Sequence, residues 1–195
     1  MTEPTGRQRK NPIMRTRVPL PPAGRSRVAL ALTAAAALGR FELQVCADCG
    51  KVQYPPREAC HGCLSLRLEW QPQSGEGELI SETVLHHSHE AYFRDHLPLR
   101  LGMVRLDTGP TVIAYLHAAA AHPPCRVKIV AGLDKAGQAA LVAIPGGHNS
   151  SEGAADMAND PQLRELICDP CAGAKSQGAR ARARSEPMNG ERQRD

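Results

Sequence analysis

Residues 41–63 read FELQVCADCGKVQYPPREACHGC, a stretch that holds two Cys-x-x-Cys pairs with ten residues between them. Two such pairs let four thiolates reach one tetrahedral metal ion at about 2.3 Å each. Gly50 directly follows the first pair and supplies the tight turn that directs backbone N–H groups toward sulfur. The pattern predicts a zinc ribbon, and because four cysteines leave no coordination position open, we expect the zinc to be structural. The predicted ligands are Cys46, Cys49, Cys60 and Cys63.

The same cysteines have two other interpretations, an iron centre of the rubredoxin type for electron transfer and a set of disulfides. The chain has seven cysteines, and an odd number suits a reduced protein with four metal-bound thiolates better than a disulfide framework. The apolar run from Val28 to Leu38 is too short to span a membrane. It also ends too close to Cys46 for a cleaved secretion signal. We therefore expect a cytoplasmic protein with no membrane segment.

A short helix is expected before the ribbon. Val28 to Leu38 reads VALALTAAAAL and is rich in Ala and Leu, the strongest helix formers. Ser26 is placed as its N-cap and Gly39 as its C-terminal stop. Residues 25–66 are thus expected to form this helix together with the zinc ribbon. The small side chains of the helix suit close docking, and we expect it to contact a partner protein.

Residues 67–146 show the two-residue alternation of side chains that is typical of strands. Leu99, Leu101 and Met103 share a face before a turn at residues 107–110. A second turn at residues 134–137 precedes a final apolar run. Five or six short strands separated by Gly and Pro predict a small closed barrel, which leaves no free sheet edge.

Both ends of the chain differ from this middle part in composition. Residues 1–24 contain five prolines and little apolar content, so they bury too little surface to offset chain entropy. We expect them to be a disordered basic tail. Residues 147–195 are polar and rich in Arg and Ala, and we expect a mostly disordered tail with one helix around Gln162 to Ile167.

The positive charge of the chain is concentrated at its ends. Residues 1–27 carry seven Lys and Arg against one acid, and residues 172–195 carry six against three, whereas residues 28–171 carry 11 basic and 16 acidic side chains. A nucleic-acid-binding protein needs a basic folded face and aromatic side chains for base stacking, and the chain has only six aromatic residues. The charge distribution disfavours nucleic acid as a partner. Nucleic-acid binding is nevertheless the alternative function, because small barrels of this kind often serve it.

The ribbon and the strands after it resemble a known protein family. The resemblance is carried by residues 41–63 with their Tyr54-Pro55-Pro56-Arg57 linker, by Leu68-Glu69-Trp70, by Gly75-x-Gly77 and by PLRLGMVRLDTGP at 98–110. The family comprises acyl-CoA-associated proteins that join an N-terminal rubredoxin-like zinc ribbon to a C-terminal OB-fold. The resemblance covers about residues 28–145. It implies a mainly β protein with an N-terminal helix, a zinc ribbon and a small OB-fold barrel over residues 67–146.

The resemblance also implies a function. Proteins of this family associate with thiolase-like enzymes, so we expect an accessory subunit that is not catalytic alone. The partner is expected to be a thiolase, acyltransferase or retro-aldolase subunit, in a hetero-oligomer of the α2β2 type. The chain would help to bind or retain the CoA part of an acyl-CoA thioester, while the partner supplies the nucleophile and the base.

Two cationic residues beside the cysteines are candidates for binding a CoA phosphate. Arg57 lies in a proline-stiffened loop, from which its guanidinium can meet a phosphate with two parallel hydrogen bonds. Lys51 follows the first cysteine pair. The alternative is that Arg57 is a surface residue that pairs with Glu58 or with an acid of a partner protein.

The other polar clusters give weaker signals. His86, His87 and His89, with His96 further on, include residue types that bind metals or carry protons. No acid or cysteine completes a recognisable site with them, so we expect a loop that edges the barrel and faces a partner or ligand.

Three cysteines lie outside the ribbon. Cys168 and Cys171 form a third Cys-x-x-Cys pair in the polar tail. We expect exposed thiols there, with a metal site shared between subunits as the alternative. Cys125 is expected to be a small buried apolar residue and not a nucleophile.

Overall fold

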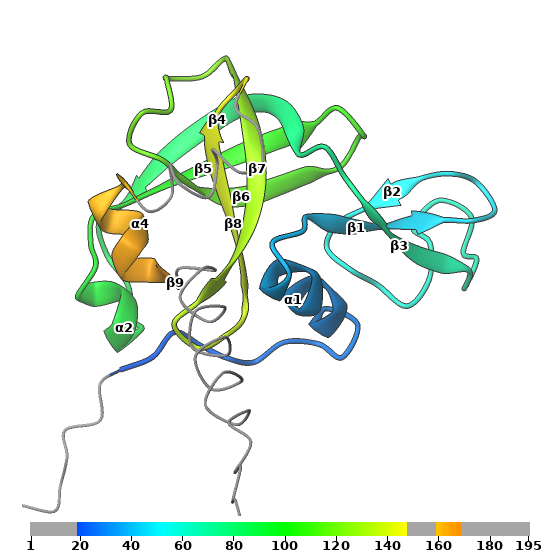
Figure 1. Ribbon diagram of the computed structural model, residues 1–195, viewed down its shortest axis with the longest axis horizontal. Coiled ribbons are helices and arrows are strands. Elements are labelled where there is room, and N and C mark those ends of the chain that lie inside the picture. The colour runs from blue at the N-terminus through cyan, green and yellow to red at the C-terminus, as the bar shows by residue number, and fades with distance from the viewer. Residues whose placement is uncertain (1–18, 148–158, 169–195) are drawn as a thin grey trace, which may run out of the picture.

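The computed structural model describes residues 19–147 and 159–168 of the chain. A three-stranded sheet lies beside a larger sheet that closes into a barrel, and one helix packs next to both (Figure 1). The predicted mainly β fold, with a ribbon followed by a barrel, is confirmed. No helix among the described residues is long and apolar enough to cross a membrane.

The helix α1 covers Leu30–Ala37, within the predicted range. Ser26 Oγ accepts a hydrogen bond from the Ala29 backbone N–H at 3.3 Å just before the helix, and Gly39 follows it with a φ of 68°. The helix buries Leu32, Ala35 and Ala36, and it contacts β7, β8 and β1. Small side chains on this face allow the close approach that the sequence predicts.

The ribbon sheet has the strand order β2-β1-β3. Its strands are β1 (Glu42–Cys46), β2 (Val52–Gln53) and β3 (Leu68–Pro72), and both outer strands run antiparallel to β1. The sequence assigned β3 to the barrel, which was expected to start at residue 67. In the structure β3 pairs with β1 along its whole length, from Cys46 opposite Leu68 to Glu42 opposite Pro72. The barrel therefore begins only after this strand.

Five strands form the barrel: β4 (Glu76–Leu85), β5 (Leu99–Leu106), β6 (Thr111–Leu116), β7 (Cys125–Asp134) and β8 (Ala139–Pro145). Their order is β4-β5-β6-β8-β7, and β7 returns to pair with β4. Only the β6 and β8 pair is parallel. This order and this single parallel contact are those of an OB-fold.

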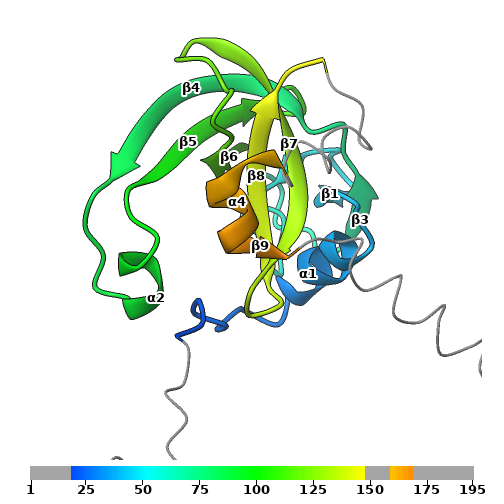
Figure 2. The ribbon, with the colours of Figure 1, turned by 60° about the vertical axis from the view of Figure 1, so that its left-hand side comes forward.

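Strand β4 is long and curved, so that it pairs with β5 along one edge and with β7 along the other (Figure 2). A bulge between Leu79 and Ser81 interrupts its ladder with β5, and such a bulge bends a strand and increases its twist. The chain enters β4 through Gly75, which has a φ of 78°. A Cβ atom at Gly75 would lie 2.2 Å from the Ile129 carbonyl oxygen, so only glycine fits there.

The barrel interior is apolar. The main cluster also includes Ala36 of α1 and Phe41 and Leu43 of the ribbon, so the ribbon docks on the barrel through apolar side chains. The buried barrel members are Leu79, Val104, Leu106, Val112, Ala114, Leu116, Val127, Ile129, Ala131, Leu141 and Ala143.

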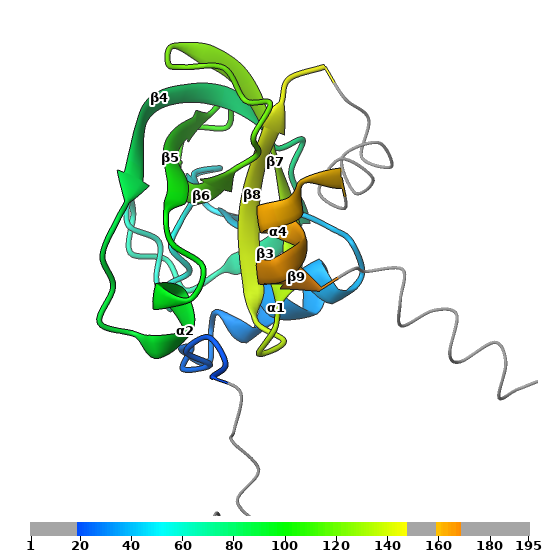
Figure 3. The ribbon, with the colours of Figure 1, turned by 90° about the vertical axis from the view of Figure 1, so that its left-hand side faces the viewer.

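A second apolar cluster joins the barrel to α2 (Ala91–Arg94), α4 (Pro161–Leu166) and β9 (Ile167–Cys168). Figure 3 shows α4 and β9 lying against the barrel, where β9 pairs with the end of β7. The sequence predicted a helix here inside a mostly disordered tail. The helix is present, and it is folded onto the barrel because Leu163, Leu166 and Ile167 are buried. Residues 148–158 and 169–195, the rest of the predicted tail, lie outside the described residues.

Candidate functional site

The four predicted ligands lie together at one end of the ribbon. The Sγ atoms of Cys46, Cys49, Cys60 and Cys63 all lie within 4.8 Å of one another. The Cys46 and Cys63 sulfurs are 3.6 Å apart, as are those of Cys49 and Cys60. A tetrahedron with metal–sulfur distances of about 2.3 Å has edges of about 3.8 Å, so the spacing suits a zinc ion. It is the only such group of three or more possible metal-ligating side chains among residues 19–147 and 159–168.

Both cysteine pairs are followed by a residue with left-handed backbone. Gly50 has a φ of 71°, which confirms the predicted tight turn, and its N–H donates to the Cys46 carbonyl oxygen at 2.8 Å. The Leu64 N–H donates to the Cys60 carbonyl oxygen at 3.0 Å with a φ of 61°. Residues other than glycine rarely adopt a positive φ, so the sequence did not predict the second turn. The only signal for it was that the second cysteine pair repeats the spacing of the first.

Backbone donors already favour a thiolate in this cluster. The Gly62 N–H donates to Cys60 Sγ at 3.3 Å, and this bond, with one from the Cys63 N–H, lowers the pKa of the Cys60 thiol to about 6. At Cys63 the Ser65 N–H lowers the pKa, but hydrogen bonds shared with Cys49 and Cys46 outweigh it and raise the pKa to about 12. The Cys60 thiol therefore loses its proton more readily than the Cys63 thiol. A bound dication would favour the thiolate at every one of them.

Two buried glutamines hold the loop between the cysteine pairs. Gln44 on β1 and Gln53 on β2 face each other in the sheet, and Gln53 Nε2 donates to Gln44 Oε1 at 2.9 Å. Gln44 also binds both backbone groups of Arg57, accepting from its N–H at 2.8 Å and donating to its carbonyl at 3.0 Å. Gln53 Oε1 accepts from the His61 N–H at 3.0 Å. These contacts fix the position of Arg57 and of the second cysteine pair.

Sequence reasoning missed this glutamine pair. A buried amide that is fully hydrogen-bonded specifies one arrangement, whereas an unsatisfied one is strongly destabilising. In the sequence Gln44 and Gln53 are polar residues nine positions apart with nothing to mark them as a pair. Only their facing positions in the β1 and β2 register reveal the pairing.

The predicted phosphate ligands Lys51 and Arg57 line the same cleft. The cleft has a volume of about 470 Å³ and lies between the ribbon and the turn at residues 108–110 of the barrel. His61 also lines it, which places three basic side chains around one opening. The side chain of Lys51 lies against Gly62, where a Cβ atom would come within 2.9 Å of Lys51 Nζ. The structure therefore brings the two candidates together, although they are six positions apart on different segments.

The histidine cluster stays in a loop, as the sequence predicts. His86, His87 and His89 are exposed and follow the end of β4, and the rings of His87 and His89 meet edge to face with centroids 5.1 Å apart. His96 is engaged separately, because its Nδ1 lies 2.7 Å from the Tyr92 carbonyl oxygen. No metal-ligating group forms around them within the described part of the chain.

Cys125 and Cys168, the two described cysteines outside the ribbon, hydrogen-bond to the backbone. Cys125 is half-buried beside the barrel core, its Sγ donates to the Ala121 carbonyl at 3.3 Å, and burial raises its pKa. Cys168 donates to the Asp134 carbonyl at 3.4 Å. Cys171, the second member of the predicted tail pair, lies outside the described residues.

None of the six aromatic side chains is fully exposed. Phe41 and Tyr92 are buried, and the other four are half-buried. Binding of single-stranded nucleic acid on an OB-fold relies on exposed aromatic rings along a basic groove. The geometry does not favour the alternative function considered from the sequence.

Comparison with known proteins gives two family matches in succession. Residues 33–69 match the model described as "ChsH2, rubredoxin-like zinc ribbon domain", and residues 70–132 match "ChsH2, C-terminal OB-fold domain". No curated protein matches the sequence.

Comparison with solved structures gives two matches. One, described as "Ltp2-ChsH2(DUF35) aldolase", is 24% identical and has a TM-score of 0.55, covering 65% of this chain and 100% of that chain. At that identity the similarity shows the fold alone. The other is a protein of unknown function from the DUF35 family of Sulfolobus solfataricus, 16% identical over 53% of this chain and 78% of that chain, with a TM-score of 0.41. That value is too low to support an argument.

Proposed function

The chain belongs to the ChsH2 family, whose members join a rubredoxin-like zinc ribbon to a C-terminal OB-fold, and from this premise we propose its function. We propose that the chain acts as a non-catalytic accessory subunit of an acyl-CoA-processing complex of the thiolase superfamily. It helps to hold the CoA part of the thioester while the partner subunit carries out the chemistry.

The observation that carries the proposal is the basic cleft beside the cysteine cluster. Arg57 belongs to a loop whose backbone is held by Gln44, and Lys51 lines the same cleft. A guanidinium that starts from a fixed backbone loses less entropy when it forms a bidentate contact with a phosphate. CoA carries three phosphates, so this cleft suits its nucleotide end.

The cysteine cluster supports a structural role for the metal. Zinc held by Cys46, Cys49, Cys60 and Cys63 would stabilise the ribbon and could not bind substrate, because four sulfurs complete its coordination. Outside the cluster, the described thiols of Cys125 and Cys168 donate to carbonyl oxygens and not to a base. The groups that break or form carbon–carbon bonds would then belong to the partner.

The partner in this proposal is a thiolase-like subunit in a hetero-oligomer with two copies of each chain, in the cytoplasm. The similar structure described as an Ltp2-ChsH2 aldolase names two components, one of them of this chain's family. The exposed side chains of Leu30, at the start of α1, and Leu38, directly after α1, suit a protein contact.

Calorimetric titration of CoA into the full chain tests the binding part of the proposal. We expect Arg57→Ala to weaken CoA binding by about tenfold, because a charged hydrogen bond is worth about 1.5–3 kcal/mol. Lys51→Ala should weaken it by a smaller factor. Arg40→Ala is the matched control, since Arg40 is an exposed ribbon arginine that pairs with Glu42 and lies outside the cleft.

Two results would contradict the proposal. One is equal CoA affinity in the Arg57→Ala and Arg40→Ala variants. The other is turnover of acyl-CoA by the isolated chain at an enzymatic rate.

A further inference from the structure

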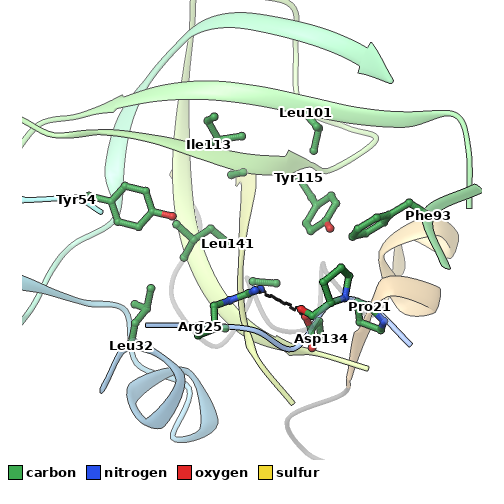
Figure 4. Close-up of a pocket in the computed structure, with 14 residues that line it drawn as sticks. Pro21, Arg25, Leu32, Tyr54, Phe93, Leu101, Ile113, Tyr115, Asp134 and Leu141 are labelled. Atoms are coloured by element: carbon green, nitrogen blue, oxygen red, sulfur yellow. Dashed lines mark hydrogen bonds and ion pairs between the residues drawn. The ribbon is translucent and has the colours of Figure 1, made fainter. Parts of the chain in front are cut away.

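A second cavity lies on the barrel, on the face made by β5, β6 and β8 (Figure 4). Its volume is about 370 Å³, which is within the range of small-molecule sites. The N-terminal segment, α1 and α2 complete its wall. Most of the lining is apolar and includes Pro21, Leu32, Phe93, Ile113, Ala140 and Leu141.

A few polar groups stand in this apolar wall. Tyr54 and Tyr115 point into the cavity (Figure 4), and within the described part of the chain their hydroxyls form no hydrogen bond. Burial raises the pKa of both tyrosines, so both hydroxyls keep their protons and can donate. Asp134 Oδ1 accepts from the Ala136 and Gln138 N–H groups. A ligand here would contact mostly apolar side chains and a few polar groups of the cavity wall.

The wall is completed by a strap of the N-terminal segment. Pro21 is buried against the barrel, and the proline ring restricts its backbone. Arg25 binds the Pro22 and Gly24 carbonyls at 3.3 and 3.0 Å, and its other terminal nitrogen lies 3.9 Å from Asp134 Oδ2. At 3.9 Å this ion pair is loose, so a ligand hydroxyl can approach the Asp134 carboxylate.

Tyr54 lines both cavities. Lys51 and Arg57 line only the basic cleft, and Leu141 and Tyr115 line only the apolar cavity. An acyl-CoA molecule has the same division, with phosphates at one end and a hydrocarbon group at the other.

We propose that the apolar cavity binds the acyl group of the thioester, a hydrocarbon chain or ring that carries a hydroxyl or keto oxygen. The hydrocarbon lies against the apolar wall, a keto oxygen accepts from Tyr54 or Tyr115, and a hydroxyl donates to Asp134. The phosphates remain in the cleft at Lys51 and Arg57, and the pantetheine arm passes Tyr54. This assignment rests on the proposed function, because it presumes that the chain binds acyl-CoA.

Titration of the full chain with acetyl-CoA and octanoyl-CoA tests the assignment. Burial of one methylene strengthens binding by about fourfold, so octanoyl-CoA should bind at least about tenfold more tightly than acetyl-CoA. Ala140→Phe places a ring in the cavity and should abolish this preference while acetyl-CoA affinity is kept. Ala119→Phe is the matched control, because Ala119 is exposed and outside the cavity. Ile113→Ser removes apolar wall at an exposed position that folding does not require, and should reduce the preference severalfold.

The possible outcomes separate this assignment from the proposed function. Equal affinity for acetyl-CoA and octanoyl-CoA in the native chain overturns the acyl site and leaves CoA binding intact. A preference for octanoyl-CoA that survives both Ala140→Phe and Ile113→Ser also overturns it. If no CoA ester binds, the proposed function fails. Titration with octanoate then decides whether the cavity binds an apolar ligand. Octanoate binding that Ala140→Phe removes would support an apolar-ligand site, and no octanoate binding would overturn it.

Discussion

The zinc ribbon and the barrel lie side by side, but they bury very different numbers of apolar side chains. In the ribbon, Phe41 and Leu43 are the only buried large apolar side chains, and both face the barrel. The barrel buries two clusters of its own. A metal site can supply about 10–16 kcal/mol to a segment that has almost no core. The two regions therefore depend on different interactions and should respond to different perturbations.

Removal of a metal ligand should give the largest effect, confined to the ribbon. Cys60→Ser should abolish tight zinc binding and unfold residues 52–63, because the metal supplies most of the folding free energy there. Zinc content and amide hydrogen exchange measure both effects. Protection at Val127 and Val142 in the barrel should persist. Loss of protection throughout the barrel would show that the two regions are not separable.

A core truncation should give the opposite pattern. Ile129 is 1% exposed in the barrel, and Ile129→Ala should lower the free energy of unfolding by about 2–5 kcal/mol in urea titration. Ile113→Ala, at a side chain that is 62% exposed, should change it by less than about 0.5 kcal/mol. Zinc content should be unchanged in both variants under native conditions. Zinc loss in Ile129→Ala would mean that the ribbon cannot hold its metal without an intact barrel.

The buried glutamine pair should show an intermediate effect in the ribbon. Gln53→Ala leaves the His61 N–H without its partner and removes one of the two donors to Gln44 Oε1, so the free energy of unfolding should fall by about 1–3 kcal/mol. Competition with a chromophoric chelator should also show weaker zinc binding. Gln71→Ala, an exposed glutamine on the same sheet, is the control and should match the native chain. Equal zinc affinity in both variants would contradict a positioning role for Gln53.

A glycine substitution in the turn after the second cysteine pair should stabilise the protein. Leu64 has a φ of 61° and is 79% exposed, so Leu64→Gly relieves backbone strain without loss of packing. The relief of about 1–2 kcal/mol is partly offset by the greater entropy of glycine in the unfolded chain, and a net gain below about 1 kcal/mol is expected. Leu66→Gly should destabilise instead, since it is equally exposed without positive φ. A loss of stability in both variants would contradict the strain at Leu64.

The smallest effect concerns an exposed ion pair on the barrel. Arg126 binds the Asp107 carboxylate through two hydrogen bonds of 2.6 and 2.8 Å and lowers its pKa below the ordinary value of 3.8. A depressed carboxyl pKa adds stability above the unfolded pKa, and this stability is lost as the pH falls through the folded pKa. Urea midpoints of the native chain should therefore fall on acidification from pH 5 to pH 2. Asp107→Asn should show a slightly smaller fall, and an identical one would mean that the pair contributes nothing.

The sequence was most informative where structure is local. The cysteine pairs, the turn at Gly50 and the helix near residue 30 each depend on neighbouring residues, and all three were predicted with their residues. The barrel was predicted from alternation within each strand. The OB-fold and its relation to a ribbon came from resemblance to a family.

Other features required the three-dimensional arrangement. The Gln44 and Gln53 pair depends on the register of two strands, which no local pattern in the sequence reveals. The placement of β3 in the ribbon depends on its pairing with the edge of β1 that β2 does not occupy. Docking of α4 depends on Leu163 and Leu166 meeting an apolar barrel surface. Tyr54 lines both cavities because of how the ribbon sits on the barrel, and sequence spacing contains no information about this.

The measurement that tests the central claim most directly is affinity capture of the tagged full chain from its native cells at moderate salt, with mass spectrometry of what co-purifies. The account predicts a thiolase-fold protein in a fixed ratio to this chain, recovered equally with the Arg57→Ala variant because Arg57 is assigned to CoA and not to the partner. Recovery of the chain alone would contradict it. So would recovery with nucleic acid that survives removal of residues 1–24 and 169–195.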